Sequence, residues 1–124
     1  MVTKEELLFE LINFSSIEKP LDADFFFNKY KLKGETLSDY RRKIAQIIRD
    51  LQNDQIYYSQ LSKPFYLIFF SGKGYYIAKN RDAAIKGRDF YSERAKSILV
   101  LTNKIDKMIN IAFPLKDDSQ LELL

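Results

Sequence analysis

Apolar residues recur at helical spacing in the first part of the chain and predict two helices there. Thr3 and Glu6 have the spacing of a capping box, in which each side chain satisfies a backbone N–H at the helix start. The apolar face that follows consists of Leu7, Leu8, Leu11, Ile12 and Phe14. A second helix is predicted from Asp22, as its cap, to Lys31, and Gly34 ends the segment.

A third helix is predicted from a cap at Ser38 to about Asn53. Its buried face is formed by Leu37, Tyr40, Ile44, Ile47, Ile48 and Leu51. Its opposite face carries Ser38, Arg41, Arg42, Gln46 and Arg49. These residue types contact phosphates and read base edges, so they form a candidate DNA-contact stripe. An ordinary solvated helix face is the alternative interpretation.

Aromatic and β-branched runs then predict strands. Residues 56–58 form a short one, and the run 65–70 forms a stronger one. Residues 71–74, with two glycines, predict a turn, and 75–78 return as a strand. Lys73 at the tip of this hairpin is either a phosphate contact or a polar turn residue.

A single long helix is predicted from about Arg81 to Ile111, with Asn80 as its cap and Pro114 at its end. Its apolar seam includes Tyr91, Ala95, Ile98, Ile105 and Ile109. A helix of about 30 residues spans about 45 Å, more than a core of this size covers. We therefore expect the distal half of the seam to pack on a second copy in a homodimer.

Three short helices followed by a hairpin give the order of a winged helix-turn-helix. The predicted fold is α+β, a winged helix-turn-helix with a long C-terminal helix. Residues 1–79 would form the winged-helix domain, 80–113 the long helix, and 114–124 a flexible acidic tail. The two predicted helices 22–31 and 38–53 would form the helix-turn-helix pair.

Composition narrows the functional classes. The chain has 124 residues, 46% of them hydrophobic, and it contains no Cys and no His. The usual zinc ligands, the usual general base and the commonest nucleophilic dyads are therefore missing. We expect no catalysis, no cofactor, no metal and no small-molecule substrate.

The charge is unevenly distributed along the chain. Residues 1–28 carry two basic and six acidic side chains, a net −4, whereas residues 29–49 carry seven basic and two acidic ones, a net +5. A basic block confined to one segment favours a polyanionic partner.

The sequence favours a cytoplasmic protein of a prokaryote or of a phage-infected host. Its longest apolar run, residues 65–70, is far shorter than the roughly 18 residues that span a bilayer. The first residues are acidic and helical and do not have the apolar region of a signal peptide.

Two stretches resemble a family of small winged-helix DNA-binding proteins of bacteriophages and prophages. Residues 38–44, Ser-Asp-Tyr-Arg-Arg-Lys-Ile, are similar to the start of that family's recognition helix, and residues 71–78, Ser-Gly-Lys-Gly-Tyr-Tyr-Ile-Ala, to its wing. The resemblance implies DNA binding through the third helix, in replication or regulation. The segment 53–64 departs from the family, whose first wing strand follows the recognition helix within a few residues.

Residues 120–124, Gln-Leu-Glu-Leu-Leu, resemble the peptide by which bacterial replication and repair proteins dock on the sliding clamp. Gln120 would form hydrogen bonds, and Leu121, Leu123 and Leu124 would fill an apolar groove. Alternatively, these leucines fold back onto the domain.

Together these observations predict a non-enzymatic protein that binds double-stranded DNA, as a transcription regulator or a phage replication accessory factor. The rival prediction is a protein–protein interaction module that binds a host or replisome protein.

Overall fold

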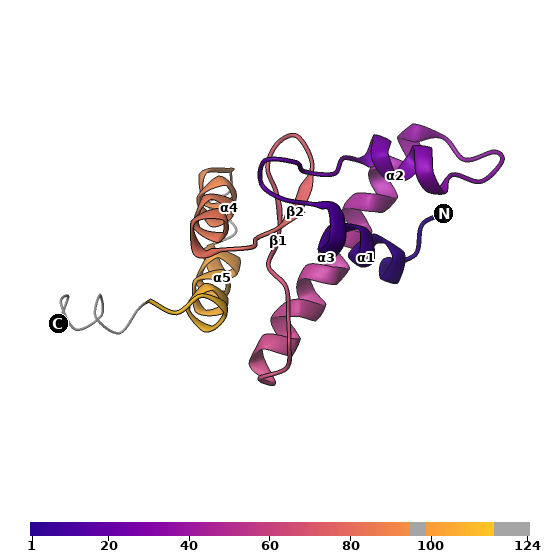
Figure 1. Cartoon of the computed structure of the whole chain (residues 1–124). Helices are drawn as coiled ribbons and strands as arrows, with labels where there is room; N and C mark the ends of the chain where they lie inside the picture. The colour runs from indigo at the N-terminus through magenta and orange to yellow at the C-terminus, as the bar shows by residue number, and fades with distance from the viewer. Residues whose placement is uncertain (95–98, 116–124) are drawn as a thin grey trace.

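The computed structural model describes residues 1–94 and 99–115 of the chain. These residues form an α+β fold of five helices and one two-stranded antiparallel hairpin, placed between the third and fourth helices (Figure 1). In chain order the elements are α1 (Lys4–Phe14), α2 (Ala23–Tyr30), α3 (Leu37–Gln60), β1 (Ile68–Phe70), β2 (Tyr75–Ile77), α4 (Arg81–Arg94) and α5 (Leu99–Ala112). None of the helices in these described ranges is long and apolar enough to cross a membrane.

The starts of α1 and α2 confirm the predicted caps. The Thr3 hydroxyl accepts from the Glu6 backbone N–H at 3.1 Å, and the Glu6 carboxylate accepts from the Thr3 N–H at 3.0 Å. The Asp22 carboxylate accepts from the backbone N–H of Phe25 at 2.9 Å. These side chains satisfy backbone donors that have no partner within the first turn of a helix.

The start of α3 differs from the prediction. Thr36, not Ser38, is the cap, because its hydroxyl accepts from the backbone N–H of Asp39 at 3.2 Å. The helix therefore begins at Leu37, and Ser38 is an exposed residue of its first turn. The apolar face is as predicted around Tyr40, which is fully buried.

The predicted strand at residues 56–58 is wrong, because α3 continues to Gln60. Polar side chains on the inner face of the helix explain the extension. Gln55 accepts from the backbone N–H of Tyr66 at 2.8 Å, and Gln52 donates to the carbonyl of Ile68 at 2.9 Å. The segment that follows α3 therefore runs back along the helix and is hydrogen-bonded to it. This packing outweighs the β propensity of the Ile-Tyr-Tyr run.

The hairpin has the predicted turn but shorter strands. Ile68 pairs with Ile77 and Phe70 with Tyr75, so β1 begins three residues later than the apolar run suggested. Leu21, between α1 and α2, adds an isolated antiparallel bridge to Tyr75, with hydrogen bonds of 2.8 Å in both directions. The edge of β2 therefore carries a short third segment.

Alternate residues of the hairpin face two separate cores. Ile68 and Ile77 belong to a cluster with α1, α2 and α3, whereas Phe69 and Tyr76 belong to one with α4 and α5. Figure 1 shows the hairpin between these two groups of helices. The two-residue period of a strand thus lets one hairpin join both halves of the fold.

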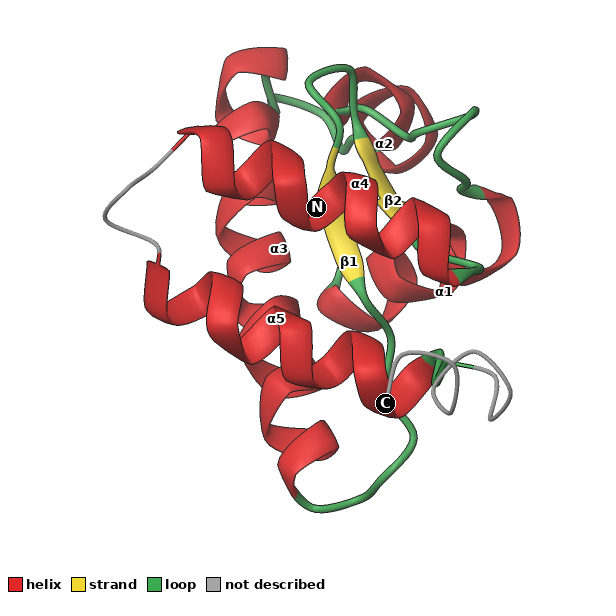
Figure 2. Ribbon diagram, turned by 90° about the vertical axis from the view of Figure 1, so that its left-hand side faces the viewer, coloured by secondary structure: helices red, strands yellow, loops and turns green. Residues whose placement is uncertain are grey.

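The single long helix predicted for residues 81–111 is wrong. Arg81 donates to the Phe113 carbonyl at 2.8 Å, and Arg88 donates to Asp106 at 2.9 Å. In a continuous helix, residues 32 positions apart would lie about 48 Å from each other. Instead α4 and α5 pack side by side, as Figure 2 shows.

This correction removes the argument for a dimer along the seam. Ile105 and Ile109 are buried in the second core of their own chain. The hydroxyl of Tyr91 accepts from Gln52 at 2.7 Å and from the backbone N–H of Phe70 at 3.1 Å. Ala95 and Ile98 lie outside the described residues. The described part of the seam is therefore covered within one chain, because α4 and α5 face each other.

Candidate nucleic-acid interface

The residues predicted to contact DNA are all exposed. On α3 they are Ser38, Arg41, Arg42, Gln46 and Arg49, and on the hairpin turn Lys73. The Arg42 side chain has 77% of its surface exposed, although Ile44 and Ile48 on the opposite face are buried. The predicted division of α3 into a core face and a polar face is therefore present.

Acidic side chains pair with part of this stripe. Arg42 lies 3.1 Å from Asp39, one turn earlier in α3, and Arg41 lies 3.6 Å from Asp24 of α2. Farther along, Gln46 donates to Asp50 at 3.1 Å. The positive charge of the stripe is consequently reduced in the free protein.

These exposed pairs do not prevent the stripe from binding an anion. A solvent-exposed ion pair contributes at most about 1 kcal/mol. A phosphate can replace the carboxylate and form a bidentate contact with the guanidinium group.

Arg49 lies close enough to the hairpin to influence it electrostatically. Burial raises the pKa of the Tyr75 hydroxyl, and the positive charge of Arg49 opposes that rise. Arg49 also donates to Gln46 at 2.7 Å. The stripe on α3 therefore extends toward β2.

The turn between β1 and β2 presents Lys73 to solvent. The Ser71 N–H donates to the Gly74 carbonyl at 2.9 Å, and Gly72 adopts φ +91°, a conformation that disfavours residues with a side chain. Gly74 lies so close to the backbone of Leu21 that a Cβ would be 2.8 Å from it. The turn is thus anchored beside the start of α2, as both views show (Figures 1 and 2).

A buried carboxylate fixes α2 against α1. Glu10 is fully buried, and its carboxylate accepts from Lys29 at 2.9 Å and from the Tyr30 hydroxyl at 3.2 Å. The hydrogen bond to Glu10 raises the pKa of Lys29, and burial raises that of Tyr30. Lys29 belongs to the basic segment, but its charge is paired with the buried Glu10 carboxylate, so we do not count it among the cations that could bind a ligand.

The described residues form no evident metal site. No group of three or more carboxylate side chains among them is placed to hold a metal ion. The predicted clamp-binding residues Gln120, Leu121, Leu123 and Leu124 lie outside the described residues.

The sequence-based prediction missed two features of this surface. One is the carboxylates beside the stripe: Asp39 and Asp50 stand three and four residues from their partners, a spacing that the sequence does show. The other is the bridge from Leu21 to Tyr75, which joins residues far apart in the chain and has no local signal.

Comparisons with known proteins return nothing that bears on this surface. No protein-family model matches the chain, and neither a curated protein nor a solved structure matches it significantly. The functional interpretation therefore depends on the residues and their geometry.

Proposed function

We propose that this protein is a winged helix-turn-helix protein that binds double-stranded DNA through the N-terminal half of α3. The proposal is supported by the element order, with three helices before a hairpin. It is also supported by the bridge from Leu21 to Tyr75, since a residue between the first two helices then pairs with the edge of the hairpin.

One observation carries the proposal: every basic or polar side chain of the predicted stripe is exposed on a helix whose opposite face is core. A protruding α-helix fits the major groove of B-form DNA. The C-terminal half of α3 packs on β1 and α5, so the exposed face of the N-terminal half is the part proposed to enter the groove.

The hairpin turn supplies a second contact in this proposal. The charge of Arg49 is close enough to Tyr75 of β2 to oppose the rise that burial causes in its pKa, and Lys73 is exposed at the turn, so both α3 and the hairpin offer cations. Arg42, Gln46 and Arg49 would contact bases and phosphates in the groove, and Lys73 would contact the backbone beside it.

Removal of two arginines from the stripe tests the proposal. Arg42→Ala/Arg49→Ala should weaken binding of a random-sequence duplex, measured by fluorescence anisotropy, with each arginine contributing about 1–3 kcal/mol. Both side chains are exposed, so circular dichroism should show an unchanged fold. Unaltered affinity of this double variant would contradict the proposal.

The matched control removes two charges elsewhere. Lys104 and Lys107 are exposed residues of α5. Lys104→Ala/Lys107→Ala lowers the net charge by the same amount as the stripe variant. It should bind DNA nearly as well as the natural protein, and an equal loss would mean that binding follows overall charge instead of the stripe.

A further inference from the structure

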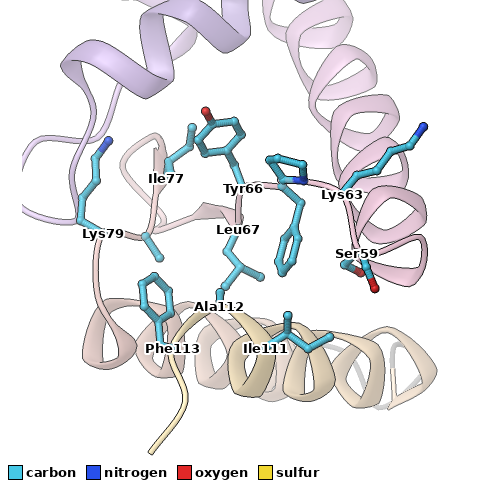
Figure 3. Close-up of a pocket in the computed structure, with 13 residues that line it drawn as sticks. Ser59, Lys63, Tyr66, Leu67, Ile77, Lys79, Ile111, Ala112 and Phe113 are labelled. Atoms are coloured by element: carbon cyan, nitrogen blue, oxygen red, sulfur yellow. The ribbon is translucent and has the colours of Figure 1, made fainter.

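A groove of about 690 Å³ opens at the end of the molecule where α3 and α5 finish. Its walls come from three separate segments, 59–67, 77–79 and 111–113. Figure 3 shows Leu67, Ala112 and Phe113 in the middle of the groove, with Lys63 and Lys79 on opposite sides. The groove is therefore apolar in its middle and positively charged at its edges.

Several apolar side chains in and beside the groove are exposed to solvent. Tyr66 is 39% exposed and Ile111 is 58% exposed, and both line the groove. Leu115, two residues beyond the groove, is 38% exposed. These exposed apolar side chains offer a surface that apolar groups of a ligand could cover.

The two lysines at the edges lack acidic partners in the part of the chain that the structure describes. Both are exposed, and neither forms an ion pair there. Lys79 donates to the carbonyl of Ile12 at 2.7 Å, which leaves its charge uncompensated. The groove thus suits a ligand that combines apolar side chains with carboxylates.

The chain itself contains such a segment. Residues 116–124 read Lys-Asp-Asp-Ser-Gln-Leu-Glu-Leu-Leu, with three acidic side chains, one basic one and three leucines, a net −2. The segment follows the groove-lining Phe113 after only two residues, and nine extended residues reach about 30 Å.

We propose that residues 116–124 dock into this groove of their own chain. The leucines cover Ile111, Ala112 and Phe113, and the acidic residues face Lys63 and Lys79. Docking within one chain is favoured over docking on a second copy, because a short tether gives an effective concentration in the millimolar range. The leucine-rich segment then occupies the groove of its own chain, and this contact does not depend on DNA binding.

A spin label on the segment tests this docking in the full chain. The sequence contains no Cys, so Ser119→Cys provides one attachment site for a nitroxide. The amide NMR signals of Ala78, Lys79 and Ile111 should lose intensity when the label is paramagnetic and regain it on reduction. The amides of α2 should be unaffected.

Two variants separate specific docking from random contact. In the labelled background, Leu121→Ser/Leu123→Ser/Leu124→Ser should restore the groove signals, because the apolar contacts are lost. Lys63→Glu, a change at an exposed residue, should restore them in part by repelling the acidic residues.

A mixed sample identifies which chain supplies the segment. Spin-labelled protein without ¹⁵N is added to ¹⁵N-labelled natural protein, so that only contacts between chains are detected. Intact groove signals in the mixture, with reduced signals in the labelled chain, support the proposal. Signal loss in the mixture, or no selective loss in either sample, would overturn it; the second result is what a segment reserved for a sliding clamp predicts.

Discussion

Individual polar side chains form hydrogen bonds that connect neighbouring elements of this fold. Gln52 and Gln55 on α3 bind the backbone that leads into β1, and Glu10 on α1 binds α2. Each contact joins residues between 11 and 19 positions apart. Buried polar groups are costly unless they are paired, so these contacts specify how the helices meet as well as stabilising them.

The sequence revealed polar residues whose partners are local and missed those whose partners are distant. Thr3 and Asp22 were predicted as caps because the residues they bond lie three positions ahead. The role of Gln55 was not predictable, since its partner Tyr66 is brought beside it only when the chain folds back along α3. A glutamine in a helix pattern ordinarily indicates solvent exposure.

At the same scale, Tyr76 should make stability depend on alkaline pH. Its side chain is buried and donates to the carbonyl of Ala83 at 3.1 Å. Burial raises the pKa of Tyr76 to about 12, whereas an unfolded tyrosine has a pKa of about 10. The folded state therefore binds this proton more tightly. The resulting stability is complete below pH about 10 and is lost as the pH rises toward about 12.

Urea unfolding across this pH range, with natural protein and Tyr76→Phe, measures the effect. The variant lacks the ionisable group, so its free energy of unfolding should fall less steeply above pH about 10. At neutral pH it should be destabilised by about 0.5–1.5 kcal/mol through loss of one hydrogen bond. Parallel alkaline profiles for the two proteins would show that Tyr76 does not titrate as described.

At the scale of elements, the local sequence pattern predicted those features that local interactions determine, such as helix caps and turns. The caps of α1 and α2 and the turn at residues 71–74 were predicted correctly. On the predicted apolar face of α1, Leu7 and Leu11 are buried, but Phe14 at the end of the helix is 56% exposed. The errors at residues 56–58 and 81–111 have a common cause. In both places the prediction treated a segment alone, whereas its conformation is set by packing against elements elsewhere in the chain.

The pairing of α4 with α5 makes Ile109 a core residue rather than part of an interface. Its exposed fraction is 1%. Ile109→Ala should lower the free energy of unfolding by about 2–5 kcal/mol, because the substitution leaves a cavity. Urea unfolding at two widely different protein concentrations should give the same loss, since the contacts lie within one chain. A loss that grows with dilution would instead place Ile109 between two copies.

At the scale of the whole molecule, the structure separates two surfaces. The stripe on α3 and the hairpin turn lie toward the end that contains α2, and the apolar groove lies where α3 and α5 finish. The stripe could be predicted because it belongs to one helix with a clear period. The groove could not, because it is assembled from three segments that are distant in sequence.

For the proposed DNA binding, the distribution of charge matters more than the net charge of +3. Six of the 17 acidic residues lie in positions 1–28, and one of them, Glu10, is paired with Lys29 inside the fold. The stripe retains Arg41, Arg42 and Arg49 at the surface. Association with DNA should therefore depend on the local arrangement of a few cations. Counterion release makes that dependence measurable through salt.

The most direct test of duplex-DNA binding is a titration of a random-sequence duplex at about 50 mM and about 200 mM salt. The stripe and the hairpin turn together offer four exposed cations, Arg41, Arg42, Arg49 and Lys73. With about 0.9 units of slope per phosphate contact, log affinity should fall against log salt with a slope of about −3 to −4, or roughly 100-fold between these conditions. Arg42→Ala/Arg49→Ala should make the slope shallower by about two units. Absence of binding at the lower salt, or binding that is insensitive to salt, would contradict the account.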